Sequence, residues 1–174
     1  MRVKSFIRSA LVLGGIAISV FVGPVQAADL RAPTGPVILT ISGDIGVTNV
    51  GETAQFDFEM LRELPATEFA TSTIWTEGVQ TFTGVPLGEL VTFMKTDASV
   101  IDATALNDYS VKVPVSDGVT GGPIIAYMID GKPFSRRDKG PLWIVYPYDQ
   151  KPEYKSELTY TRSIWQLDRL HFSN

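Results

Sequence analysis

Three short segments of the chain combine aromatic, hydroxyl and charged side chains, the mixture from which a binding or catalytic site is built. They are residues 71–78 (TSTIWTEG), 135–141 (SRRDKGP) and 146–149 (YPYD). The second is a cluster of cations. The third continues from an apolar run over 142–146, so its polar groups would lie where a buried strand ends.

With residues nearer the C-terminus, these segments supply flat aromatic faces, guanidinium donors, hydroxyls and a carboxylate: Trp75, Tyr148, Trp165, Arg136, Arg162, Thr71, Thr73 and Asp149. Such groups suit a planar heterocycle, because aromatic rings stack on its plane while a carboxylate or guanidinium pairs with its edge. The composition equally allows Trp75 and Trp165 to be core residues and the cations to be a solvated hairpin tip. We assign Arg137 and Asp138 to such a tip.

The composition excludes several classes of site. The 174 residues include no cysteine and a single histidine, His171. Disulfides, thiolate nucleophiles, iron–sulfur clusters and sulfur-bound zinc are therefore excluded, and a Ser-His-Asp arrangement is not evident. No glycine-rich segment has phosphate-loop spacing. An acidic chain without a basic run is also a poor candidate for binding nucleic acid.

Residues 1–27 have the pattern of a secretory signal peptide. Basic residues precede an apolar run over 10–22, and the segment ends in Val25-Gln26-Ala27. We expect cleavage after Ala27 and a periplasmic mature protein of residues 28–174; an uncleaved anchor is the alternative, although the run is short for a span of ~20 residues. The segment holds three of the 15 basic side chains and none of the 19 acidic ones, so the mature chain has a net charge of −7.

The mature chain is expected to form one α+β domain, since most of its patterns are those of strands. Asp57 can cap a helix that runs to Leu64, and Pro86 suits the first turn of a helix whose apolar residues recur at helical spacing from Leu87 to Met94. An Asp130-Gly131 turn is typical of a hairpin. The predicted strands are 36–42, 45–50, 69–75, 109–115, 124–129, 142–146 and 163–170. In the last of them, alternation places Gln166 and Leu170 on one face and Leu167 on the other.

The order of motifs resembles the molybdopterin-binding domain of the sulfite oxidase superfamily. The motifs, between about residues 36 and 170, are Thr71-x-Thr73-x-Trp75, Phe82-Thr83-Gly84-Val85-Pro86-Leu87, Ala105-Leu106-Asn107-Asp108-Tyr109, Ile125-Ala126, Asp130-Gly131-Lys132, Lys139 to Pro147, and Arg162 to Leu167. The ordered set carries the resemblance. It implies a mixed α+β sulfite-oxidase-type fold.

One departure bears on function. Enzymes of this superfamily hold molybdenum through a cysteine shortly before the Gly-Val-Pro-Leu segment, where this chain has Thr71 to Trp75. A hydroxyl is a weaker metal ligand than a thiolate at neutral pH because its proton is harder to remove. The chain more closely resembles the short, exported, metal-free pterin-binding (PruR-type) members. That resemblance implies a non-catalytic protein, a pterin as ligand without metal, and a partner in the periplasmic region of a membrane enzyme that makes and degrades cyclic di-GMP.

The resemblance also suggests roles for individual residues. Thr73 and Trp75 would line the pterin pocket, with Tyr148 as a further aromatic face. Arg136 and Lys139 would approach the carbonyl and ring nitrogens, and Asp149 would pair with the 2-amino and N3–H edge. Arg162 and Trp165 complete the predicted site, with an ion pair or strand packing as their alternative roles. A molybdenum-cofactor oxidoreductase with a non-cysteine ligand and an interaction module with a vestigial pocket are the alternative functions.

Overall fold

The computed structural model describes residues 30–174, so the predicted signal peptide lies outside the described residues. Within them the chain combines one mixed sheet with short helices, which confirms the α+β prediction. None of the helices in this part of the chain is long and apolar enough to cross a membrane.

The strands are β1 (Leu39–Gly43), β2 (Ala54–Phe56), β3 (Thr67–Ser72), β4 (Val79–Pro86), β5 (Val100–Ala105), β6 (Ser110–Pro114), β7 (Ile124–Ile129), β8 (Lys132–Pro133), β9 (Leu142–Val145) and β10 (Trp165–Ser173). The α-helices are α1 (Phe58–Glu63), α2 (Leu87–Met94) and α3 (Glu157–Arg162), with 3₁₀ turns η1 (Val115–Asp117) and η2 (Pro152–Tyr154). Strand order along the main path is β2-β1-β10-β9-β7-β4-β3, while β5 pairs with β10 and β6, and β8 pairs with β7.

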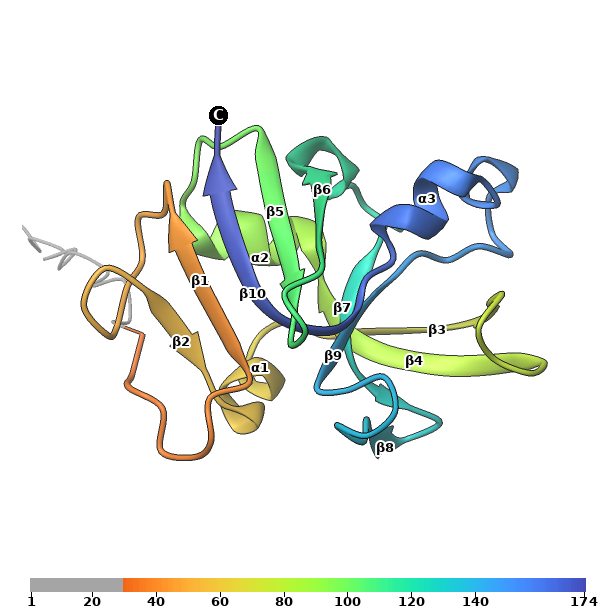
Figure 1. Ribbon diagram of the computed structural model, residues 1–174, viewed down its shortest axis with the longest axis horizontal. Coiled ribbons are helices and arrows are strands. Elements are labelled where there is room, and N and C mark those ends of the chain that lie inside the picture. The colour runs from red at the N-terminus through yellow and green to blue at the C-terminus, as the bar shows by residue number, and fades with distance from the viewer. Residues whose placement is uncertain (1–29) are drawn as a thin grey trace, which may run out of the picture.

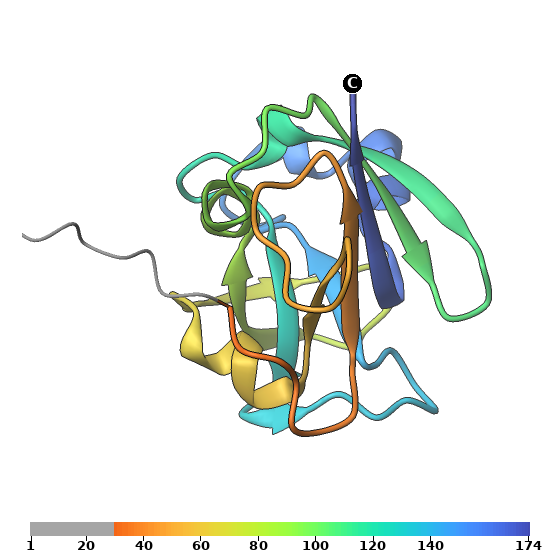
Figure 2. The ribbon, with the colours of Figure 1, turned by 90° about the vertical axis from the view of Figure 1, so that its left-hand side faces the viewer.

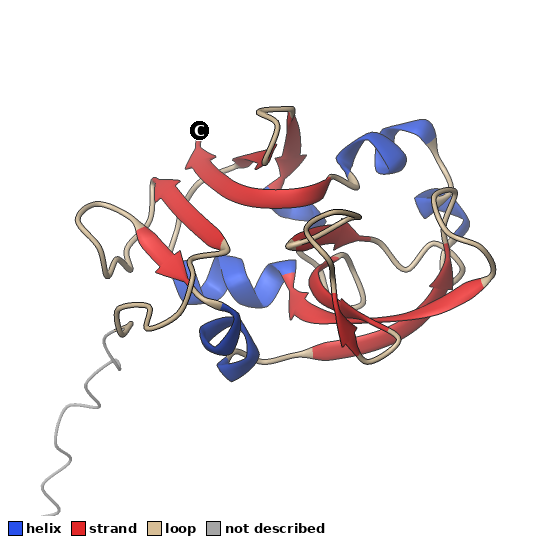
Figure 3. Cartoon of the chain, turned by 60° about the horizontal axis from the view of Figure 1, so that its bottom comes forward, coloured by secondary structure: helices blue, strands red, loops and turns tan. Residues whose placement is uncertain are grey.

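The sheet turns strongly along its length. β1, β10 and β5 run nearly upright in Figure 1, whereas β3 and β4 run across the view. β1 and β10 are parallel, and β10 pairs antiparallel with β9 and β5. Figure 2 shows α1 and α2 on the same side of the β1–β10 pair. β3 ends the path and lies along the outer edge in Figure 3.

A bulge in β10 overturns the predicted alternation of 163–170. Leu167 and Leu170 are both buried, because the register shifts between Leu167 and Arg169 in the pairing with β5. Asp168 is the extra residue in that pairing, and it moves the second half of β10 to the opposite alternation. In the pairing with β9 the register shifts between Trp165 and Leu167, where Gln166 has a positive φ of 53°, which a strand residue with a side chain rarely adopts.

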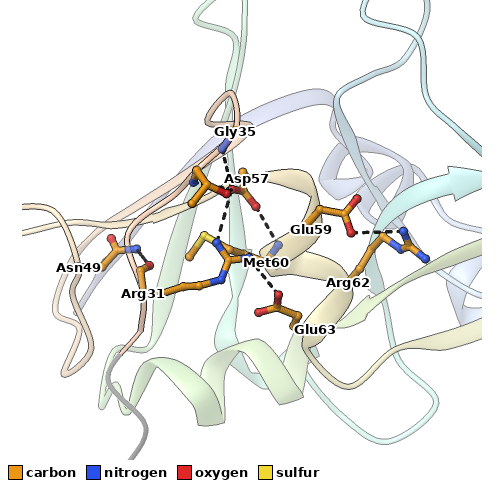
Figure 4. Close-up of polar contacts among 9 residues, drawn as sticks. Arg31, Gly35, Asn49, Asp57, Glu59, Met60, Arg62 and Glu63 are labelled. Carbon is orange, nitrogen blue, oxygen red and sulfur yellow. Dashed lines mark hydrogen bonds and ion pairs between the residues drawn. The ribbon is translucent and has the colours of Figure 1, made fainter.

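Asp57 ties the first described residues to α1 (Figure 4). One carboxylate oxygen accepts from the backbone N–H of Met60 at 2.9 Å, as predicted for an N-cap. The other accepts from the N–H groups of Thr34 and Gly35 at 2.9 and 3.0 Å, and Arg31 lies 3.7 Å away. These N–H donors lower the pKa of the buried Asp57 carboxyl to about 2.

The predicted strand over 45–50 is wrong. This segment is a loop, and the neighbour of β1 is β2, at 54–56. Asn49 organises the loop: its amide donates to the carbonyls of Arg31 and Gln55 at 2.7 and 2.8 Å, and its oxygen accepts from the Gln55 N–H. A short polar side chain that binds the backbone in this way competes with strand pairing.

The centre of the core lies on β9. All four of its residues are buried, and the ring of Trp143 contacts Phe82 and Phe134, with centroid distances of 5.4 and 6.1 Å. Gly84 in β4 allows β7 to approach closely, since a Cβ there would lie 2.3 Å from the carbonyl oxygen of Ile125. The Gly-Val-Pro-Leu segment thereby joins β4 to α2 against the core.

Candidate ligand site

Two adjacent hollows share the side chains of Trp75, Trp165 and Gln166, and we call them together the aromatic groove. One hollow has a volume of about 310 Å³ and the other about 350 Å³. The first is further lined by Ala105, Asn107, Tyr109, Tyr160, Thr161, Ser163 and Ile164. The second is further lined by Arg137, Asp138 and Lys139. The groove therefore has aromatic and amide groups at one end and charged groups at the other.

A hydroxyl-stabilised turn holds Trp75 at the groove. β3 ends at Ser72, short of the predicted boundary at Trp75. The Oγ1 of Thr73 accepts from the backbone N–H of Trp75 at 3.0 Å and lies 2.7 Å from the hydroxyl of Thr76. Such a bond from a threonine to the backbone two residues later is a common way to fix a turn. Thr73 thus shapes the site by positioning Trp75.

Trp143, in the core, lies next to both of the partly exposed indoles of the groove, Trp75 and Trp165. Trp75 is half-buried and meets Trp143 and Tyr160 edge to face, with centroid distances of 5.7 and 5.8 Å. Trp165 is 40% exposed and is the register partner of Trp143 across β10 and β9. Edge-to-face contacts hold an indole in orientation while leaving part of its surface for another molecule. Trp75 and Trp165 are therefore only partly core residues.

Gln166 holds the basic loop 135–139 against the groove. Its amide nitrogen donates to the carbonyls of Arg136 and Asp138, both at 3.1 Å, and its backbone N–H donates to the carbonyl of Lys139 at 2.9 Å. The ammonium of Lys139 lies 3.1 Å from the Asp138 carboxylate and 5.9 Å from the Trp143 ring. The loop consequently presents Lys139 at the groove, whereas the described contact of Arg136 is through its carbonyl.

Asp149 lies apart from the residues that line the groove. Its carboxylate accepts from the backbone N–H and the hydroxyl of Ser72, and it is 2.8 Å from the ammonium of Lys155. The hydrogen bond from Lys155 and those from Ser72 lower the pKa of Asp149 well below its usual range. The carboxylate fastens the 146–150 segment to the end of β3.

Arg162 and Tyr148 are also engaged within the protein. The guanidinium of Arg162 contacts both oxygens of Asp117, at 3.0 and 3.3 Å, and Asp117 also accepts from the hydroxyl of Tyr146 at 2.6 Å. Tyr148 is buried, and its hydroxyl donates to the Oγ of Ser163 at 2.6 Å. Burial raises the pKa of Tyr148 above its usual range, so this hydroxyl stays protonated.

The structure therefore separates the predicted site into two groups. Trp75, Lys139 and Trp165 line the groove, with Thr73 and Arg136 beside them. Tyr148, Asp149 and Arg162 lie outside its lining, each with an intramolecular partner. Contact of any of these residues with a ligand stays a prediction.

Sequence reasoning assigned Arg137 and Asp138 to a solvated tip, whereas both line the charged end of the groove. It also gave no site role to several residues at the other end, among them Asn107, Tyr109, Tyr160 and Gln166. Asn107 lies in the β5–β6 turn and Tyr109 lies beside it. The side-chain oxygen of Asn107 accepts from the backbone N–H of Tyr109 at 3.2 Å. Tyr160 lies on α3, a helix whose signal is Ser156, which accepts from the Thr159 N–H as an N-cap and is followed by an acidic first turn.

Comparison with known proteins supports the fold. No protein-family model and no curated protein matches the chain. A solved structure does: the sulfane dehydrogenase SoxCD from Paracoccus pantotrophus superposes with a TM-score of 0.58 at 16% identity. The chain has a sulfite-oxidase-type fold. The match covers 78% of this chain and 37% of the SoxCD chain, so this protein spans little more than a third of that neighbour's length.

The likeness to SoxCD shows the arrangement of strands and helices, and at 16% identity it shows the fold alone. The predicted sulfite-oxidase-type fold is confirmed.

Proposed function

We propose that this protein is a periplasmic pterin receptor that binds its ligand in the aromatic groove without metal or catalysis. Bound and free forms would differ in affinity for the periplasmic region of a membrane signalling protein, such as a cyclic-di-GMP enzyme. The resemblance to the metal-free pterin-binding proteins supports the ligand class and the partner. The observation that carries the proposal is the groove between Trp75 and Trp165, with Gln166 at its centre.

The groove offers the contacts that a bicyclic heterocycle needs. The exposed surfaces of Trp75 and Trp165 can stack on a flat ring. The amides of Asn107 and Gln166 offer donors and acceptors to the ring edge, and Lys139 adds a cation at the other end. A hollow of about 310 Å³ is at the lower end of the volumes of small-molecule sites.

The groups present do not fit a protein–molybdenum bond of the kind that the superfamily's enzymes use. The segment that would supply the ligand contains Thr71 and Thr73 in place of cysteine. The Thr71 hydroxyl donates to the carbonyl of Ser72 and accepts from the Asp149 N–H, and the Thr73 hydroxyl holds the Trp75 turn. Both hydroxyls are already used in the fold, and a neutral hydroxyl is a poor ligand beside a thiolate.

A fluorescence titration tests the proposal. Purified residues 28–174 are titrated with tetrahydropterin, dihydropterin and a purine, and tryptophan emission is followed. We expect saturable quenching by a pterin and at least tenfold weaker binding of the purine. Stacking of a base on an aromatic side chain contributes ~1–3 kcal/mol, so Trp75→Ala should weaken binding by roughly five- to 150-fold.

Tyr154→Ala is the matched control, because this half-buried aromatic lies on η2 against Tyr146 and away from the groove. It should bind pterins as the unmodified protein does. Pterin affinity that is unchanged in both Trp75→Ala and Trp165→Ala would exclude the groove as the site. Stoichiometric molybdenum in protein purified from its own periplasm would instead favour an oxidoreductase, and no pterin binding would favour an interaction module.

A further inference from the structure

One edge of the sheet is open for pairing with another strand. Among residues 30–174, β3 is the last strand of the path and pairs with β4 alone. Ser72, at the end of β3, donates its backbone N–H to Asp149. At the Ser72–Val79 pair, the backbone N–H and C=O of Ser72 therefore point away from β4. Backbone direction alternates along an antiparallel strand, and the N–H and C=O groups of Ala70 and Glu68 therefore also face outward.

The pairing of β4 supports this alternation. Thr81 is the partner of Ala70, and it turns its own backbone away from β3: its N–H donates to the Asp130 side chain and its carbonyl accepts from the Asp130 N–H. Ala70 and Glu68 are both exposed. Asp149 covers only the Ser72 end of the edge.

The other ends of the sheet are protected in ways that β3 is not. β2 has three residues, too few to accept a long added strand. β6 carries Lys112 and ends in Pro114, and both a lysine and a proline discourage edge pairing. β3 has six residues, contains neither lysine nor proline, and carries one acidic side chain, Glu68.

A groove of about 440 Å³ borders the start of β3 and is separate from the aromatic groove. Its charged lining residues are Glu68 and Glu89, and none of its lining residues is basic. An extended peptide paired to β3 would place alternate side chains beside this acidic groove.

We propose that β3 is a docking edge for an extended, lysine- or arginine-bearing segment of a partner protein, which adds as a strand and places its cations at Glu68 and Glu89. Hydrogen bonds to the backbone of Glu68 and Ala70 supply affinity that does not depend on sequence. The two carboxylates select the charge of the segment. The site is distinct from the aromatic groove, and docking needs no ligand there.

A labelled peptide tests this edge. A ten-residue peptide of alternating Lys and Val is titrated with the mature chain, and fluorescence anisotropy is measured. We expect saturable binding and at least tenfold weaker binding of the Glu-Val counterpart. A peptide of the same composition with its lysines and valines in two blocks should also bind at least tenfold more weakly, because only alternation suits one face of an added strand.

Three variants separate edge pairing from general attraction to an acidic protein. Ala70→Pro removes an outward N–H that β4 does not use, so the fold should persist while peptide affinity falls at least tenfold. The double variant Glu68→Gln/Glu89→Gln should bind the Lys-Val peptide several-fold more weakly, and its binding should depend less on salt. Glu52→Gln, an exposed carboxylate outside the groove lining, is the matched control and should have no effect.

The outcomes distinguish this proposal from the pterin proposal. Trp75→Ala should leave peptide binding unchanged whatever it does to pterin binding. Equal affinity of Ala70→Pro and the unmodified chain, or no binding of the Lys-Val peptide, would overturn the docking edge. A dimer in sedimentation that Ala70→Pro converts to monomer would show a second copy as occupant and overturn the cationic partner.

Discussion

The backbone N–H of Gln166 donates to the carbonyl oxygen of Lys139 at 2.9 Å, which joins the β10 bulge to the basic loop 135–139. The Gln166 side chain adds two bonds to the same loop, to the carbonyls of Arg136 and Asp138. The residue with unusual backbone geometry is thus also the one that positions the charged end of the aromatic groove. A bulge that re-aims a strand beside a site commonly has such a role.

Replacement of Gln166 by Ala should loosen this loop. The change removes both side-chain bonds but keeps the backbone bond, so we expect faster amide hydrogen exchange across 135–139 with the rest of β10 little changed. Pterin affinity should fall several-fold if Lys139 contributes to binding. Gln150→Ala, an exposed glutamine outside the aromatic groove, should change neither measurement. Unchanged exchange in Gln166→Ala would show that the loop is held by other contacts.

Sequence patterns predicted best the elements whose conformation is determined by local sequence and is not changed by packing against distant segments. Residues 124–129 form β7 with the predicted bounds, and the Asp57 cap is present as expected. Asp130 and Gly131 both have positive φ, as the predicted hairpin turn requires. In each case a local feature, either an apolar run or a residue with a fixed conformational preference, is sufficient to determine the structure.

The parts that sequence patterns missed depend on contacts between distant segments. Nothing in the type of Gln166 signals a positive φ, so the bulge and the reversed alternation after it could not be anticipated. Trp75 and Trp165 could be named from composition as aromatic faces. Their neighbours Tyr109 and Tyr160 could not, because a hairpin and a short helix bring them to the groove only when the sheet is complete.

Gly84→Ala should destabilise the protein although it adds a single methyl group. The new Cβ would lie 2.3 Å from the carbonyl oxygen of Ile125, and β7 would have to move away. Overpacking of this kind costs ~1–3 kcal/mol, so we expect a loss of that size in the free energy of unfolding when the variant and the unmodified protein are compared by urea denaturation. Gly35→Ala is the control, since its Cβ would meet only the Asp57 side chain at an ordinary 3.6 Å. Equal stabilities of the two variants would contradict the close approach of β4 and β7.

Arg162→Met should destabilise the fold more than Tyr146→Phe does. Arg162 and Asp117 form a largely buried ion pair with 21% and 18% of their side chains exposed, and removal of the cation leaves a carboxylate with little solvent. We expect a loss of about 3 kcal/mol for Arg162→Met, at the lower end for a buried pair because both side chains keep some exposure. Tyr146→Phe removes one hydrogen bond to the same carboxylate and should cost about 1 kcal/mol. In the Asp117→Asn background, Arg162→Met should cost much less, and full additivity in denaturant would show that the pair is not coupled.

Asp57 should make the stability of the protein depend on acid pH. Its folded-state pKa is lowered from 3.8 to about 2, so the ionised carboxylate stabilises the folded state at pH values above 3.8. That contribution is lost as the pH falls from about 4 to 2, because protonation then favours the unfolded chain.

Asp57→Ala should lose ~1–2 kcal/mol at pH 7 through the missing cap. It should also show a smaller further loss between pH 4 and pH 2 than the unmodified protein, in urea titrations at each pH. Asp97→Asn, which removes an exposed carboxylate outside the α1 cap, is the matched control, and its stability at each pH should follow that of the unmodified protein. An equal acid slope in Asp57→Ala would assign the dependence to other carboxylates.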